Sequence, residues 1–481
     1  MKKNSKQFYS YLKKTTSNRV SVGPLIGDSG MVTDSREMAE LLNDQYCSVF
    51  KREWVERPEA EQLFRGEDGL KDMQFQAGKV EKKLKQLKPS AAPGPDRVWT
   101  RVLHTMAEVL ANPLSVIFGR LMGEGEVPGI WRKANVCPIF KKGTKGDPAN
   151  YRLVSLTCVV GKVMESLIRD ELVAHLERFN LIRGSQHGFM GGRSTTTNLL
   201  VYLETLTRLI NEGHCVDVLY LDFAKAFDKV PHGKLMDKCR GLGVGGRVLE
   251  WIRKWLANRE QRVILNGVTS GWREVLSGVP QGSVLGPTLF VIFINDIDEV
   301  VKVNAESILL KFADDTKLGV VVETEEQREA LQEAIRGLEG WADKWQMEFN
   351  ASKCHVLHLG RRNNEYSYTM GEVELARVEE EKDVGVMIHH TLKPSLQCAK
   401  ASARANQVLG QLARGVGYRD KVTFLQLYRV YVRPHLEYAV VSWCPWSKGD
   451  RDCLEKVQRR ALGMVTNLQA GTYESRCGRR V

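Results

Sequence analysis

The chain has 481 residues, and its 43% share of hydrophobic residues excludes an intrinsically disordered protein. Lysine and arginine number 70 against 58 aspartates and glutamates, so the formal charge of +12 favours a polyanionic partner, either nucleic acid or an anionic membrane surface. The apolar run LFVIFI (289–294) is too short to span a bilayer, and the N-terminus MKKNSKQFYSYLKK lacks the apolar stretch of a secretory signal. We therefore expect a protein of the nucleus or cytoplasm that has no membrane segment. Its ten cysteines include no CxxC pair and predict reduced thiols, not a disulfide framework or a zinc site.

The N-terminal region contains one clear helix signal, SREMAELLNDQYCSVF (35–50), for which Ser35 is the expected N-cap. The apolar stripe of this helix consists of Met38, Leu41, Leu42 and Tyr46. Further along, KPSAAPGPDRV (88–98) has three prolines and a glycine, which exclude regular structure. This segment predicts a loop between helices or a linker.

Helices and strands then intermix. The segments at 161–179 and 194–213 have apolar residues at helical spacing, and the second helix is expected to end at Gly213. VDVLYLDF (216–223) predicts a strand buried on both faces over part of its length. A long helix is expected after Thr324, which fits a capping box with Gln327. From about Leu392 the pattern is mostly helical, so we expect an α+β protein with a helical C-terminal module.

Three segments carry candidate chemistry. The first, LYLDFAKAFDKVP (219–231), places Asp222 at the end of the predicted strand. The second, LSGVPQGSVLGPTLF (276–290), is a glycine-rich loop in which Gly278 and Gly282 allow close approach to a ligand, while Gln281 offers a donor and an acceptor. The third, ILLKFADDTKLGVVV (308–322), reads as a hairpin with Asp314 and Asp315 at its tip.

If these three aspartates converge, their mutual repulsion requires a divalent cation. Carboxylate oxygens select hard ions such as Mg²⁺, and two such ions about 3.5–4 Å apart assist an in-line phosphoryl transfer. The alternative is an exposed acidic turn together with an unrelated aspartate at a strand end. The glycine-rich loop between the two acidic segments favours the catalytic interpretation.

Read in order, these segments resemble the reverse transcriptases of non-LTR (LINE-type) retrotransposons, especially the jockey and chicken-repeat groups. The motifs DFAKAFD, SGVPQGSVLGP and FADDTKL are similar to the palm of that family. WRKANVCPIFKKG, NYRLVSL and QHGFMGGRST precede them, and WQMEFNASKCHVLHLG, DVGVMI, LYRVYVRPHLEYAVVSW and LEKVQRRAL follow. The similarity covers about residues 88–465.

The resemblance implies a right-hand polymerase fold with fingers, a palm built from an antiparallel sheet with helices, and a helical thumb. It implies RNA-directed DNA polymerase activity that uses an RNA template, a DNA primer, dNTPs and two Mg²⁺ ions, with Mn²⁺ as an alternative. The implied site residues are Asp222, Asp314 and Asp315 as metal ligands, Lys353 as the acid that protonates pyrophosphate, Arg152 with Lys141 and Lys142 at the triphosphate, Gln281 and Gly282 at the nucleotide, and Phe227 as the gate against a 2′-hydroxyl. Asp228 is expected to fix local structure instead of binding metal.

The expected division is an N-terminal connector (1–87), fingers and palm (88–390), a thumb (391–470) and a truncated tail (471–481). Leu153 stands where the family usually has proline, and this change is expected to loosen the loop that carries Arg152. The chain resembles a copy without the family's N-terminal endonuclease. A catalytically silent nucleic-acid-binding remnant is therefore the second hypothesis. A nucleotide cyclase is disfavoured because its GG[DE]EF-type turn is missing.

Overall fold

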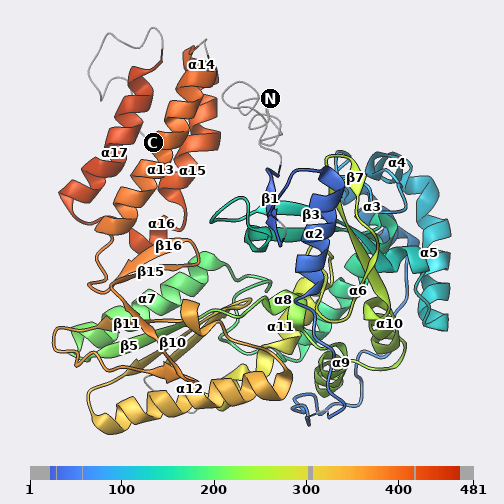
Figure 1. Cartoon of the computed structure of the whole chain (residues 1–481), viewed down its shortest axis with the longest axis horizontal. Helices are drawn as coiled ribbons and strands as arrows, with labels where there is room; N and C mark the ends of the chain where they lie inside the picture. The colour runs from blue at the N-terminus through green and yellow to red at the C-terminus, as the bar shows by residue number, and fades with distance from the viewer. Residues whose placement is uncertain (1–21, 29, 57, 302–306, 417–418, 466–481) are drawn as a thin grey trace.

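The computed structural model describes residues 22–28, 30–56, 58–301, 307–416 and 419–465. Two five-stranded sheets have helices packed on them, and a group of helices follows on the C-terminal side (Figure 1). The mixture of helix and sheet agrees with the expected α+β class. The nine cysteines of the described residues are free, and none of the helices described there has the length and apolar character needed to cross a membrane. The expected tail (471–481) lies outside the described residues.

The first of the two sheets, named the carboxylate sheet here, has the strand order β14-β11-β5-β10-β9. Its strands are β5 (Val216–Leu221), β9 (Ile308–Phe312), β10 (Asp315–Val321), β11 (His355–Leu359) and β14 (Ala376–Val378). The strand predicted around 216–223 is the central strand β5. Leu219 and Leu221 belong to the buried cluster that contains α12 (Glu325–Trp345), whereas Val216 and Val218 belong to the cluster that contains α7 (Thr195–Asn211). These two helices cover opposite faces of the sheet (Figure 1), which explains why β5 is apolar on both faces.

The second sheet, named the arginine sheet because it carries Arg152, has the order β4-β3-β6-β7, with β8 also paired to β6. Its strands are β3 (Lys133–Phe140), β4 (Tyr151–Leu156), β6 (Arg259–Leu265), β7 (Val268–Thr269) and β8 (Arg273–Val275). β3 runs antiparallel to β4 and parallel to β6. Short strands elsewhere form the pairs β1 (Leu25–Gly27) with β2 (Gly30–Val32), β12 (Thr369–Met370) with β13 (Val373–Glu374), and β15 (Glu380–Asp383) with β16 (Val386–His389).

The helices predicted from apolar spacing are confirmed. Residues 161–178 of the first segment lie in α6 (Val159–Arg178), and the capping box of Thr324 and Gln327 opens α12 as predicted. The segment 88–98 has neither helix nor strand, as its prolines indicated. The remaining helices before the C-terminal group are α3 (Ala77–Gln86), α4 (Thr100–Thr105), α5 (Ala107–Glu124), α8 (Ala226–Lys229), α9 (His232–Gly241), α10 (Gly246–Leu256) and α11 (Gly286–Phe293).

The N-terminal helix α2 (Ser35–Cys47) forms where it was predicted, but its cap is different. Asp34 is the N-cap and accepts hydrogen bonds from the backbone N–H groups of Arg36 and Glu37, so the prediction of Ser35 is wrong. Asp34 is the better cap because its carboxylate accepts two of the free N–H groups and carries a negative charge at the positive end of the helix. The apolar face of α2 packs on the arginine sheet.

After α2, residues 51–56 and 58–73 form an extended segment, named the strap here, that runs along α9 and α10. The carboxylate of Glu53 accepts from the backbone N–H groups of Gly233 and Lys234 at 2.7 and 2.8 Å, which caps α9. The N–H groups of Leu63 and Phe64 both donate to the carbonyl of Gly241. The strap therefore satisfies backbone groups at both ends of α9.

The C-terminal part is helical as expected from about Leu392. It comprises α13 (Ser395–Gly415), α14 (Lys421–Leu427), a π-helical turn (Tyr428–Val432), α15 (Arg433–Glu437), α16 (Val440–Trp443) and α17 (Lys448–Gly463). Residues of α13, α14, α15 and α17 share one hydrophobic cluster. In Figure 1 this group stands at the upper left, away from α4 and α5.

Candidate active site

The acidic turn lies at the end of the β9–β10 hairpin. Phe312 pairs with Asp315, which leaves Ala313 and Asp314 as a two-residue turn, and Ala313 has a left-handed φ of 58°. β10 also pairs with β5, with Thr316 opposite Leu221, so the next positions along these two strands are Asp315 and Asp222. Strand register therefore brings the three predicted aspartates to one end of the carboxylate sheet.

The three carboxylates influence one another electrostatically. Burial raises the pKa of Asp314, and the negative charge of Asp222 adds to this shift. The surrounding protein also raises the pKa of Asp315 to about 6 by desolvation, although part of this side chain reaches solvent. The charge of Asp314 is the next contribution, followed by those of Asp383 and Asp222. A cation bound here would relieve this repulsion.

Positive side chains approach from two directions. The Nζ atom of Lys353 lies 3.6 Å from Oδ2 of Asp222, and the backbone N–H of Asn350 donates to the Asp222 carbonyl at 2.7 Å. Burial lowers the pKa of Lys141, and the positive charge of Arg152 lowers it further, while Asp222 acts in the opposite direction. Lys353, Lys141 and Arg152 thus belong to the electrostatic environment of the carboxylates, whereas Lys142 lies exposed in the bend after β3.

The donor set suits a hard divalent cation, because it consists of carboxylate oxygens whose charges repel one another. Within the described residues, no three metal-ligating side chains lie close enough together to form a ready-made metal cluster. Asp222, which has 42% of its side chain exposed, has room to turn toward an ion. The residues present therefore suit a hard divalent cation such as Mg²⁺, which binds one or two carboxylates and takes its other ligands from water and phosphate.

The glycine-rich loop packs between β4 of the arginine sheet and α8. Gly278 and Gly282 have φ values of 89° and 111°, and a Cβ on them would lie 2.6 Å from the backbone of Asp228 and 2.7 Å from that of Ser155, respectively. In this structure these glycines therefore permit close approach to the protein's own backbone. The Ser155 N–H donates to the Gln281 carbonyl at 2.8 Å, which ties the loop to β4.

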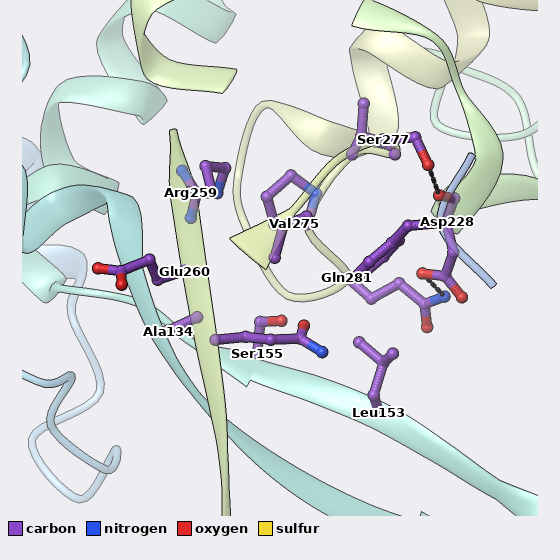
Figure 2. Close-up of a pocket in the computed structure, with 14 residues that line it drawn as sticks. Ala134, Leu153, Ser155, Asp228, Arg259, Glu260, Val275, Ser277 and Gln281 are labelled. Atoms are coloured by element: carbon purple, nitrogen blue, oxygen red, sulfur yellow. Dashed lines mark hydrogen bonds between the residues drawn. The ribbon is translucent and has the colours of Figure 1, made fainter. Parts of the chain in front are cut away.

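Gln281 is held through its side chain. Its Nε2 donates to Oδ1 of Asp228 at 3.1 Å, at one side of a small pocket lined also by Leu153 and Arg259 (Figure 2). Burial raises the pKa of Asp228 to about 6. The Asp228 carbonyl also accepts from the hydroxyl of Ser277 at 2.8 Å. These contacts agree with the expectation that Asp228 fixes local structure.

Two other predicted residues have distinct surroundings. The ring of Phe227 stacks on Phe290, with a centroid distance of 4.3 Å and an interplanar angle of 17°, so Phe227 has a firm support. Arg152 is exposed on β4, while Leu153 is buried against the α2 side of the sheet and pairs with Pro138 of β3. The predicted loosening of a loop at Leu153 is wrong, because this position is a strand residue that pairs with Pro138 and packs in a hydrophobic cluster.

Sequence reasoning missed other polar residues at this end of the sheet. Asp383 forms a buried ion pair with Lys317 of β10 and adds to the pKa shift of Asp315. The side chain of Gln186 contacts Ala313 in the acidic turn. Both residues fall within motifs that carried the family resemblance, QHGFMGGRST and DVGVMI. Those motifs were the available signal, but their spacing alone did not indicate a contact with the turn.

The comparisons with known proteins agree with this geometry. The family model described as reverse transcriptase (RNA-dependent DNA polymerase) matches residues 139–411, more than half of the chain. The chain belongs to this family.

Three relatives are RNA-directed DNA polymerases by name. The protein from mobile element jockey of Drosophila funebris is 28% identical over 378 residues, which cover 75% of this chain and 40% of the relative. The probable enzymes from transposons X-element and BS of Drosophila melanogaster are each 24% identical, over 79% and 80% of this chain and 42% and 44% of the relatives. The chain thus spans about two fifths of the length of these curated relatives.

Proposed function

We propose that this chain is an RNA-directed DNA polymerase that extends a DNA primer on an RNA template. The observation that carries the proposal is the strand register that brings Asp222 together with Asp314 and Asp315. Membership of the reverse transcriptase family suggests that this cluster of aspartates catalyses nucleotidyl transfer. The basic side chains that face the cluster suit the binding of a triphosphate.

The proposed division of the molecule follows its layers. The carboxylate sheet with α7 and α12 would be the palm, the arginine sheet with its helices the fingers, and the helices from α13 onward the thumb. We keep the boundaries near residues 87, 390 and 470 as part of this proposal. The strap and α2, which lie within the expected N-terminal connector, would then pack against both fingers and palm and would not form a separate domain.

The reaction would join the primer 3′-oxygen to the α-phosphorus of a dNTP and release pyrophosphate. Two bound Mg²⁺ ions would activate the hydroxyl and neutralise charge on the leaving group. Asp222 and Asp314 would hold these ions, with Asp315 as a third ligand. Arg152 and Lys141 would bind triphosphate oxygens, since a guanidinium fork matches phosphate geometry. Lys353 would donate the proton that pyrophosphate takes up, and Lys142 would contribute positive charge at the edge of this site.

The nucleotide would lie against the loop of Gln281 and Gly282. Asp228 holds the amide of Gln281 in one orientation, which reduces the entropy lost when a nucleotide binds. Phe227 would exclude a 2′-hydroxyl, because Phe290 behind it prevents the ring from moving away.

Primer extension on an RNA template with Mg²⁺ tests the proposal. We expect the double variant Asp314→Asn plus Asp315→Asn to lose activity by at least about 1,000-fold, on the order of 4 kcal/mol in activation free energy. The matched control is Asp72→Asn, an exposed aspartate paired with Arg247, which should extend primers like the wild type. Unchanged activity in the double variant would refute the catalytic assignment. Tight binding of the template–primer duplex without any incorporation by the wild type would instead identify a nucleic-acid-binding protein.

A further inference from the structure

The acidic turn contains an unfavourable backbone conformation. Ala313, the residue before Asp314, has a left-handed φ of 58°, which costs a non-glycine residue on the order of 1 kcal/mol. The preceding strand β9 is also the edge strand of the carboxylate sheet, so only one side of β9 is paired with another strand of that sheet. A turn with these properties needs support from outside the sheet if it is to hold Asp314 in one place.

The support comes from the side chain of Gln186. Its Oε1 accepts from the backbone N–H of Ala313 at 3.0 Å, and its Nε2 lies 3.5 Å from the Ala313 carbonyl oxygen. The amide thereby pairs with both backbone groups of Ala313, as the peptide of a neighbouring strand would. Oε1 also accepts from the N–H of Gly188 at 2.7 Å, and Gln186 is only 1% exposed.

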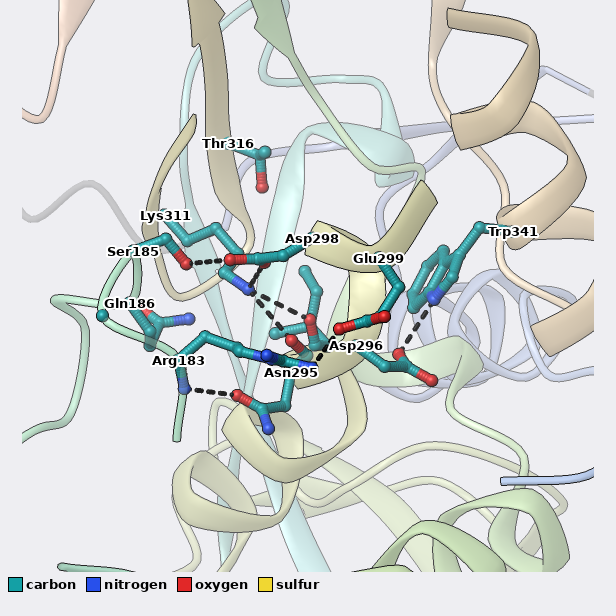
Figure 3. Close-up of polar contacts among 12 residues, drawn as sticks. Arg183, Ser185, Gln186, Asn295, Asp296, Asp298, Glu299, Lys311, Thr316 and Trp341 are labelled. Carbon is teal, nitrogen blue, oxygen red and sulfur yellow. Dashed lines mark hydrogen bonds and ion pairs between the residues drawn. The ribbon is translucent and has the colours of Figure 1, made fainter. Parts of the chain in front are cut away.

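The segment that carries Gln186 is itself fixed to β9. The N–H of Lys311 donates to the Ser185 carbonyl, and the N–H of His187 donates to the Lys311 carbonyl, both at 2.8 Å. The buried side chain of Lys311 forms an ion pair with Asp298, and the Ser185 hydroxyl donates to the same carboxylate at 2.6 Å (Figure 3). Residues 185–188 are therefore held by backbone hydrogen bonds to Lys311 and by a side-chain hydrogen bond to Asp298.

Steric contact adds to this arrangement. A Cβ on Gly188 would lie 2.3 Å from the backbone nitrogen of Ala313, so only glycine lets the segment approach the turn this closely. Close approach places the Gln186 amide within hydrogen-bond reach. Both residues thus act on Ala313. Gly188 leaves room for the close approach because it has no side chain, and Gln186 forms hydrogen bonds through its amide.

We propose that Gln186 is a positioning residue. It holds the Ala313–Asp314 turn in the place from which the Asp314 carboxylate binds the divalent ion. This inference rests on the proposed function, because it assigns Gln186 a role in that reaction. Without the amide, the Ala313 N–H and carbonyl lose their partner, and the left-handed turn is free to relax. A displacement on the order of 1 Å of a reacting group lowers rates by about 100-fold.

The main test variant is Gln186→Met, which keeps most of the side-chain volume and removes the hydrogen bonds. We expect kcat of primer extension to fall about 10- to 100-fold, with the Kd of the RNA–DNA duplex changed less than twofold. Mn²⁺ affinity, measured from the electron paramagnetic resonance signal of free Mn²⁺, should fall in parallel. Hydrogen exchange of the backbone amides in residues 312–316 should become faster.

Asn198→Leu is the matched control. Asn198 is also 1% exposed, and its Nδ2 donates to the carbonyl of Lys311 at 3.2 Å, two residues before Ala313. Both variants remove a buried amide that contacts β9 or the turn after it, so both should lower the melting temperature. Only Gln186→Met should change exchange at the turn, Mn²⁺ affinity and kcat.

Unchanged exchange at residues 312–316 in Gln186→Met, or an equal acceleration in Asn198→Leu, would overturn the inference. The exchange measurement needs neither metal nor activity. If the wild type fails to extend primers, the proposed function fails, while faster exchange in Gln186→Met alone still supports the role of Gln186 in holding the turn. Gly188→Ala provides a second variant and should give the same pattern with a larger loss of kcat.

Discussion

The carboxylate sheet and the arginine sheet have five strands each, but different polar groups tie them to their neighbours. In the carboxylate sheet the fully buried carboxylate of Asp217 accepts from His358, Asn363 and Tyr368 at 2.7 to 2.8 Å. In the arginine sheet an uncharged amide, Asn43 of α2, donates to Ser270 and Gly271 at 3.1 and 3.0 Å.

The difference reflects what each sheet presents to the site. β5 carries Asp217 inside the protein and Asp222 at its end, so a buried charged network fixes the strand that carries the proposed metal ligand. The arginine sheet presents the exposed side chain of Arg152, and this sheet is secured by the packing and hydrogen bonds of α2. Charged networks are costly to disrupt, so the two sheets should respond unequally to the loss of one side chain.

A comparison of the free energies of unfolding of Asp217→Ala and Asn43→Ala measures this difference between the two sheets. We expect the free energy of unfolding to fall by about 3–5 kcal/mol for Asp217→Ala, because the buried side chains of His358 and Tyr368 lose their acceptor. For Asn43→Ala we expect a loss of about 1–3 kcal/mol, the usual cost of leaving neutral partners unsatisfied. Urea denaturation at neutral pH provides both values. Equal losses would contradict the distinction between the two sheets.

Arg152→Ala tests the function of the arginine sheet. Loss of a guanidinium from the triphosphate should lower kcat/KM for dNTPs by about 30- to 100-fold, which is about 2–3 kcal/mol. Arg152→Lys should recover only part of this, since an ammonium lacks the planar fork. Arg336→Ala, which removes an exposed arginine paired with Glu333, is the control. If Arg152→Ala behaved like this control in steady-state kinetics, Arg152 would have no part in nucleotide binding.

Asp228→Asn should give the smallest effect, visible as a change in pH dependence. Burial raises the folded-state pKa of Asp228 to about 6, so its contribution to stability is present at about pH 4 and is lost as the pH rises through about 6. Asparagine stays neutral, and its oxygen still accepts from Gln281. The variant should therefore gain stability relative to the wild type between about pH 4 and pH 7. Unfolding midpoints that differ by a constant amount over this range would contradict the assignment.

Local patterns predicted much of the fold. The capping box at Thr324, the apolar spacing of α6 and the doubly apolar strand β5 can each be recognised from residues only a few positions apart. The position of the α2 cap was missed because Asp34 and Ser35 are both good caps. The identity of these two side chains alone does not decide which of them starts the helix.

Contacts between distant segments were beyond what spacing can predict. The motifs containing Asp222, Asp314 and Asp315 did not by their spacing show that the three side chains converge. Their convergence was inferred because a metal-assisted phosphoryl transfer requires several carboxylates in one place. Nothing in the spacing placed Gln186 against Ala313, 127 residues later, since that contact depends on the edge position of β9. Arg152 was assigned to a loop, whereas pairing with β3 makes its segment a strand.

The strap has a practical consequence for anyone who wishes to express only the part of the chain that matches the family. The family match begins at residue 139, which makes that position an attractive place to start a shortened gene. Such a fragment would lack the Glu53 carboxylate at the start of α9 and the Phe64 ring that packs against His175 and Phe179. A groove of apolar surface and uncapped N–H groups would face water. Shortened genes should therefore begin before residue 34, so that α2 and the strap remain attached.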